Sequence, residues 1–106
     1  MRYLLIACFC LFAQPSKAIE ISMYEQLPSD HKTDYIGGVA AGMSAIHFIS
    51  QNKGYRQLFC LPDGTRLGAN LARAALMTFE DRYSSDGATD VSVAVILGLE
   101  IMFPCG

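Results

Sequence analysis

The chain contains no tryptophan, only two histidines and no run of lysine or arginine residues. Neither His31 nor His47 lies in an HxxxH motif, and His31 stands in a polar linker while His47 stands on a predicted helix, which indicates no metal or hydrolase centre unless its members are distant in sequence. The lack of a basic run argues against nucleic acid or an anionic membrane surface as the partner. We therefore expect a protein partner, with no metal, no cofactor and no catalysis by this chain.

An apolar run long enough to span a membrane, about 20 residues, is also missing. Residues 3–13 form an 11-residue apolar core after Met1 and Arg2, and small residues follow up to Ala18. This is the pattern of a signal peptide over residues 1–18, cleaved after Ala18. A retained anchor is the alternative, as is lipidation at Cys8, although only residues 3–7 would then precede the cysteine as the apolar region. We expect export to the periplasm.

Removal of the leader leaves one small domain, residues 19–106, with 88 residues. Arg2 and Lys17 leave with it, so six basic and ten acidic side chains remain and the net charge is −4. A basic protein is therefore the partner that best matches its charge. A domain of this size buries a limited core and is commonly helped by a covalent staple or an oligomeric contact.

Only two cysteines, Cys60 and Cys105, remain after cleavage, because Cys8 and Cys10 belong to the leader. In an oxidising compartment we expect the remaining pair to form a disulfide, which would stabilise the fold by up to about 4 kcal/mol. A nucleophilic Cys60 is the alternative, with only the two histidines as possible bases.

Apolar spacing predicts an all-α fold, a small bundle of about four helices with one disulfide. The predicted elements are a short helix or ordered arm at 19–27, a helix capped by Thr33 or Asp34 and ended by Gly54, a helix at 66–82 capped by Thr65, and a helix at 91–103. The last segment is almost wholly apolar and rich in β-branched residues, so a strand is also possible there. We favour a buried central helix, capped by Thr89 or Asp90 and ended by Pro104.

Two glycines four residues apart, Gly38 and Gly42, leave a stripe of the second helix almost without side chains. Another helix can approach closely there, either inside the fold or across a homodimer. A phosphate loop would need a preceding strand and a following Lys-Ser/Thr pair, and a membrane dimer motif would need a wholly apolar segment. The sequence around these glycines has neither, so close packing of helices in water is the favoured interpretation.

Three short motifs, in this order, carry a resemblance: YIGGV at residues 35–39, FCLPDGT at 59–65 and FPC at 103–105. Together with the leader, they resemble the Rap/Tai immunity-protein domain family over residues 35–106. The chain departs from that pattern in having no proline just after the third helix and no extra cysteine in its first half. The resemblance implies an exported, all-α, often dimeric protein that inhibits a peptidoglycan amidase toxin delivered by type VI secretion.

The resemblance also implies that a protruding loop blocks the active-site cleft of the amidase, and residues 83–90 are the best candidate for that loop. Tyr83 would anchor the contact, Ser84 and Ser85 would form hydrogen bonds, and Asp86 and Asp90 would supply carboxylates for a basic partner. With the disulfide bracing the helices on either side, this loop would be the far tip of a helical hairpin. The alternative is that it merely connects two helices.

A second functional class also fits the sequence. A periplasmic acid-stress chaperone-like holdase would share the small size, the disulfide and an apolar last helix exposed when a dimer dissociates. Such a protein would dissociate and suppress aggregation of client proteins at low pH, whereas an immunity protein would bind one enzyme near neutrality.

Overall fold

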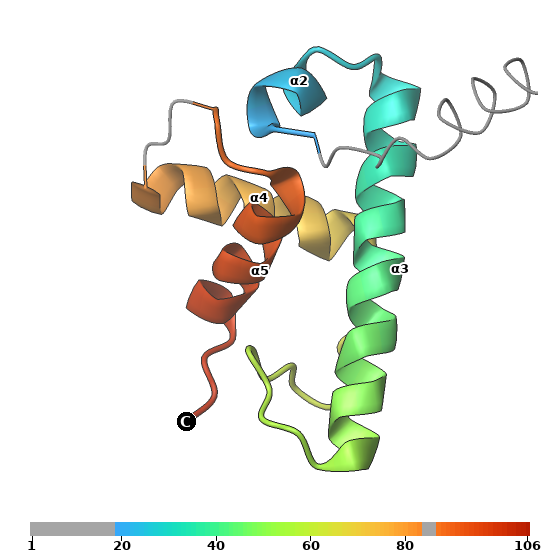
Figure 1. Ribbon diagram of the computed structural model, residues 1–106, viewed down its shortest axis with the longest axis vertical. Helices are drawn as coiled ribbons and strands as arrows, with labels where there is room; N and C mark the ends of the chain where they lie inside the picture. The colour runs from blue at the N-terminus through green and yellow to red at the C-terminus, as the bar shows by residue number, and fades with distance from the viewer. Residues whose placement is uncertain (1–18, 84–86) are drawn as a thin grey trace, which may run out of the picture.

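The computed structural model describes residues 19–83 and 87–106, which form four helices joined by loops (Figure 1). These are α2 (Ile21–Glu25), α3 (Ser29–Lys53), α4 (Ala69–Tyr83) and α5 (Val91–Met102). In the described ranges, the only strand-like pairing is an isolated antiparallel bridge between Glu20 and Asp90. The predicted all-α fold of about four helices is therefore confirmed. The predicted leader, residues 1–18, lies outside the described residues.

The long helix α3 begins at Ser29, earlier than the predicted cap at Thr33 or Asp34. Pro28 precedes it at φ −58°, a value compatible with entry into a helix. Thr33 is thus inside the helix, where its hydroxyl donates to the Ser29 carbonyl at 3.1 Å. The predicted end is confirmed, because Gly54 has φ 70° and its amide donates back to the Gln51 carbonyl.

Residues 55–68 form a long loop that returns along α3 before α4 starts. The amide of Thr65 donates to the Pro62 carbonyl at 3.0 Å, and Gly64 has φ 84°, so the predicted turn is present. The prediction that Thr65 caps a helix starting at residue 66 is wrong. The next residues instead stay outside the helix, which begins at Ala69, because Leu67 is buried and its carbonyl accepts a hydrogen bond from Ser44 of α3.

The core lies mainly between α4 and α5. Four buried α4 residues meet four buried α5 residues there: Ala72, Ala75, Leu76 and Phe79, then Val91, Ala94, Val95 and Leu99. Burial is nevertheless confined to the inner side of α5, since Val93 is 46% exposed and Glu100 is exposed. The prediction of a central helix is therefore right for one face only.

The two helices approach each other most closely at Gly98. A Cβ atom added there would collide with the backbone carbonyl of Ala75. Only glycine lets the backbones of α4 and α5 come this close.

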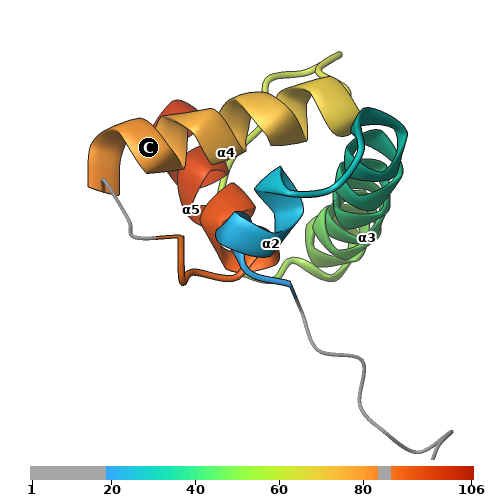
Figure 2. The same ribbon diagram turned by 90° about the horizontal axis from the view of Figure 1, so that it is seen from above.

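The N-terminal arm fastens the start of α5 to the rest of the fold. The Ile21 amide donates to the Thr89 carbonyl, and the Val91 amide donates to the Ile19 carbonyl, both at 3.0 Å. The Ser22 amide donates to the Gly87 carbonyl at 3.1 Å. Figure 2 shows the result, with α2 lying against the beginning of α5. Residues 87–90 are consequently held by backbone hydrogen bonds and do not stand free of the fold.

Candidate protein-interaction surface

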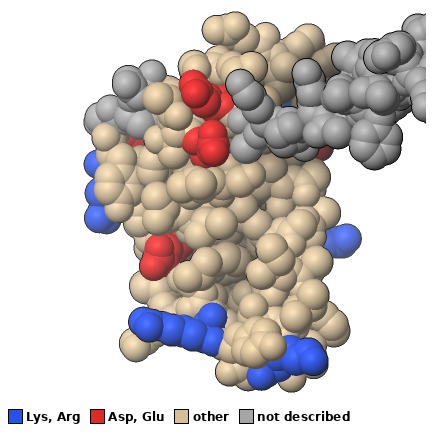
Figure 3. Space-filling view, in the orientation of Figure 1, with Lys and Arg blue, Asp and Glu red and all other residues tan. Residues whose placement is uncertain are grey.

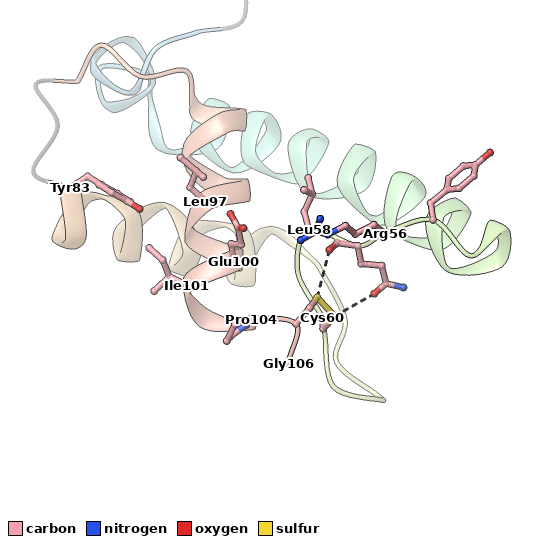
Figure 4. A pocket seen from close by; sticks show the side chains of 12 residues that line it. Arg56, Leu58, Cys60, Tyr83, Leu97, Glu100, Ile101, Pro104 and Gly106 are labelled. Atoms are coloured by element: carbon pink, nitrogen blue, oxygen red, sulfur yellow. Dashed lines mark hydrogen bonds between the residues drawn. A yellow bond between two sulfur atoms is a disulfide. The ribbon is translucent and has the colours of Figure 1, made fainter.

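An open groove of about 1080 Å³ runs along the C-terminal half of α5 (Figure 4). Leu97, Glu100 and Ile101 of α5 line one side of it. Residues 55–58 form the opposite wall, and Tyr83 reaches in from the end of α4. The disulfide cysteines and the chain end, residues 104–106, complete it. For a protein of this size, the groove is large enough to receive a segment of another protein.

The predicted disulfide joins Cys60 to Cys105, whose Cα atoms are 5.0 Å apart. The Cys60 amide also donates to the Phe103 carbonyl at 2.8 Å, so two bonds tie the long loop to the end of α5. Gln57 lies against this junction, with its side-chain oxygen 3.7 Å from the Cys60 sulfur. A covalent disulfide is compatible with an oxidising compartment.

A second anchor fixes the same loop to α3. The rings of His47 and Phe59 stack, with centroids 5.0 Å apart and an angle of 8° between their planes. Phe59 is buried by this contact. The contacts at Phe59, Cys60 and Leu67 fix the loop next to residues 55–58, which form the groove wall. The exposed side chains of this wall remain free to contact a partner.

Several side chains on the groove are of the kinds that dominate the energy of protein interfaces. Tyr55, Leu58 and Tyr83 are more than half exposed, although each has a large apolar surface. Arg56 and Glu100 add one charge of each sign. Tyrosine and arginine are enriched among the residues whose removal costs most binding energy. The groove therefore has the composition of a protein-binding surface.

The sequence-predicted loop is divided by the structure. Tyr83 ends α4, packs on Phe79 at 5.0 Å between ring centroids and faces the groove. Asp90 is half-buried beside Glu20 at the start of α5, and its side chain makes no capping hydrogen bond. Ser84, Ser85 and Asp86 lie outside the described residues. Tyr83 and Asp90 thus belong to different surroundings.

No described residue of this chain packs closely against the stripe predicted for close helix packing. A Cβ added at Gly38 or Gly42 would have nothing within 4 Å, and both glycines are exposed on α3. Close approach occurs instead at Gly98, which sequence analysis did not single out from its apolar surroundings. Of the two predicted arrangements, packing of this stripe inside the fold is not found among residues 19–83 and 87–106.

The groove residues on the long loop were missed by sequence reasoning. Tyr55, Arg56 and Leu58 follow the Gly54 helix stop, in a stretch too short for apolar periodicity to be read. The available signal was compositional: an aromatic residue, an arginine and a leucine stand together where a polar connector is expected.

One carboxyl group departs from ordinary behaviour. Burial raises the pKa of Glu80 on α4, and Glu25 of α2 raises it further through charge repulsion and a shared hydrogen bond. Asp81 adds a smaller repulsion that also raises this pKa. All three influences favour the protonated form of Glu80.

Within residues 19–83 and 87–106, no three His, Cys, Asp or Glu side chains lie close enough together to hold a metal ion. None of the helices in these ranges has both the length and the apolar character needed to cross a bilayer. Comparison with known proteins finds no matching family model, no similar curated protein and no matching solved structure.

Proposed function

We propose that this chain is an exported immunity protein that binds a peptidoglycan amidase and blocks access to its active-site cleft. The proposal rests on the three ordered motifs that resemble the Rap/Tai family and on one structural observation. That observation is the groove, where Tyr83 and the exposed residues of the 55–58 loop meet beside a covalent brace. The periplasm, where such an amidase would act, is the proposed compartment.

To block an active-site cleft, an inhibitor needs a surface of matching shape that is already rigid, and it needs no reactive groups. An inhibitor that is already ordered loses little conformational entropy on binding, so more of its contact energy appears as affinity. Here the disulfide, the His47–Phe59 stack and the Ser44–Leu67 hydrogen bond hold the groove wall in place before any partner arrives. Tyr83 and Arg56 are the proposed anchors for the amidase surface.

The proposal is tested with purified type VI cysteine-histidine amidases, starting with any encoded beside this gene. The protein should inhibit one of them stoichiometrically near neutral pH. Tyr83→Ala should weaken binding at least about tenfold, as expected for an aromatic anchor that the partner buries on binding. Met77→Ala is the matched control, because Met77 is 60% exposed on the same helix and does not line the groove. Equal affinities of both variants and the unaltered protein would remove the groove from the interface.

A second variant tests the contribution of the loop after α4 separately from that of the groove. Ser85→Arg combined with Asp86→Arg places two cations in the segment that the resemblance implies is inserted into the cleft. A large loss of affinity in this variant alone would favour loop insertion. A loss with Tyr83→Ala alone would favour docking on the groove.

One observation favours the chaperone-like holdase as a second candidate. Ile46, Phe48 and Ile49 on α3 are each more than half exposed and offer an apolar surface to a client protein. The last helix, by contrast, is a poor client surface, because its inner face is buried against α4 within a single chain. A holdase should suppress aggregation of unrelated proteins at low pH, and the absence of suppression there would eliminate this candidate.

A further inference from the structure

We infer that α3 is the contact between two copies of this chain, which pair as antiparallel helices around a twofold axis near residues 43 and 44. This inference is independent of the amidase proposal, because it concerns a different surface. It develops one of the two arrangements predicted for the Gly38 and Gly42 stripe, the homodimer, into a specific interface with a specific alignment of residues.

The exposed side of α3 lies directly opposite its buried side. Ile36, Ala40 and Met43 face the core, and successive α-helical positions advance by about 100°. The residues at the centre of the opposite face are all exposed and carry no charge: Gly38, Ala41, Gly42, Ala45 and Ile49. Ile46 and Phe48, which are also exposed, lie toward the two edges of this face. An uncharged face of this length on one helix is a surface that gains free energy when covered.

Two copies of this face are complementary in shape only when the two helices run antiparallel. Its first half is small, with Gly38 and Gly42, and its second half is bulky, with Ile46 and Ile49. Consider two copies of α3 that lie antiparallel, with each residue opposite the residue of the other copy whose number brings the sum to about 87. In this alignment Ile49 of each copy lies over Gly38 of the other. Gly42 then meets Ala45 near the axis, where the backbones approach most closely. A parallel pair would place isoleucine on isoleucine and leave a gap between the glycines.

Charge selects the same alignment. Between Asp34 and Lys53 the helix has no Asp, Glu, Lys or Arg, and both of these end residues are exposed. The antiparallel alignment brings Asp34 of each copy beside Lys53 of the other, which forms two attractive pairs. A parallel pair would bring Asp34 onto Asp34 and Lys53 onto Lys53. In Figure 3, Lys and Arg side chains gather at the end of the molecule where α3 stops.

The expected affinity follows from the size of the contact. From Asp34 to Lys53 the helix is about 28 Å long, and a single helix face covers less than the roughly 800 Å² per partner of a standard stable interface. Association in the micromolar range is therefore expected, with the dimer dissociating on dilution.

The first test measures the mass of the protein, expressed with its own leader, over a concentration series by sedimentation velocity. Gly42→Leu should keep the protein monomeric at concentrations where the unaltered chain is dimeric, because the new side chain blocks close approach at the axis. It should not impair folding, since nothing lies within 4 Å of a Cβ at this position and leucine favours helix over glycine. A dimer of unchanged strength with Gly42→Leu, or a monomer at every concentration without it, would overturn the inference.

The second test reverses the charges. Asp34→Lys alone and Lys53→Glu alone should each raise the dimer dissociation constant about tenfold, because each change turns two attractive pairs into repulsive ones. Both changes in one chain restore attraction in the antiparallel alignment and should restore dimerisation. Met77→Gln, an exposed change on α4, is the control and should have no effect. A double variant as weak as the single ones would rule out this alignment.

Discussion

At the level of single residues, Gly98 has the sharpest structural requirement in the described chain. A methyl group there meets the Ala75 carbonyl, and backbone atoms cannot move aside as a flexible side chain can. Gly98→Ala should therefore destabilise the protein by about 1–3 kcal/mol, despite the better helix propensity of alanine. Gly37→Ala is the matched control, because it lies in a helix with open space around it and should stabilise by up to about 1 kcal/mol. The stabilities are compared by the urea concentration at the midpoint of unfolding. Equal midpoints for the two variants would contradict this account.

The contrast among these glycines explains one failure of prediction. A stripe such as Gly38 and Gly42 indicates only that another helix can approach closely. Whether the approach occurs depends on which helix lies opposite, and this is decided by loop lengths and by the return of residues 55–68 along α3. Gly98 gave no such signal, because a single glycine in an apolar run has many possible explanations.

At the level of secondary-structure elements, helix existence was predictable and helix starts were not. The end of α3 was read correctly because Gly54 is the residue type that adopts φ 70° without strain. Its start was misread because Thr33 and Asp34 are good capping residues that happen to lie inside the helix. The start of α4 was misread because burial of Leu67 keeps the residues after the turn out of the helix. Tertiary contacts thus outweighed local capping preferences at both positions.

The disulfide is the element-level feature with the largest expected effect on stability. It closes a loop with a sequence separation of 45, for which chain entropy gives up to about 4 kcal/mol. Cys60→Ser combined with Cys105→Ser should lower the free energy of unfolding by up to that amount, as should reduction of the unaltered protein. The variant should also bind the amidase less tightly, because the groove wall loses its brace. A stably folded variant that binds fully would make the disulfide a stabilising feature only.

At the level of the whole molecule, the two proposed contacts use separate surfaces. The groove is lined by residues of the long loop, α4, α5 and the chain end, and none of its lining residues belongs to α3. The proposed dimer contact lies entirely on the exposed side of α3. Sequence reasoning pointed to Tyr83 for a protein partner and to the Gly38 and Gly42 stripe for helix packing or a homodimer. It missed the rest of the groove, because that surface is assembled from the relative placement of the long loop, α4 and α5.

This separation predicts how the contacts combine. If both proposals hold, the unaltered protein should form a complex of two inhibitors and two amidases, and Gly42→Leu should form a complex of one and one. The affinity for the amidase should stay the same in the two cases, since the substitution changes no residue of the groove. Light scattering coupled to size-exclusion chromatography measures the masses, and calorimetry measures the affinity per site. A Gly42→Leu protein that is monomeric and also fails to bind would mean that the amidase contacts α3, or that its binding surface is completed only by the second copy.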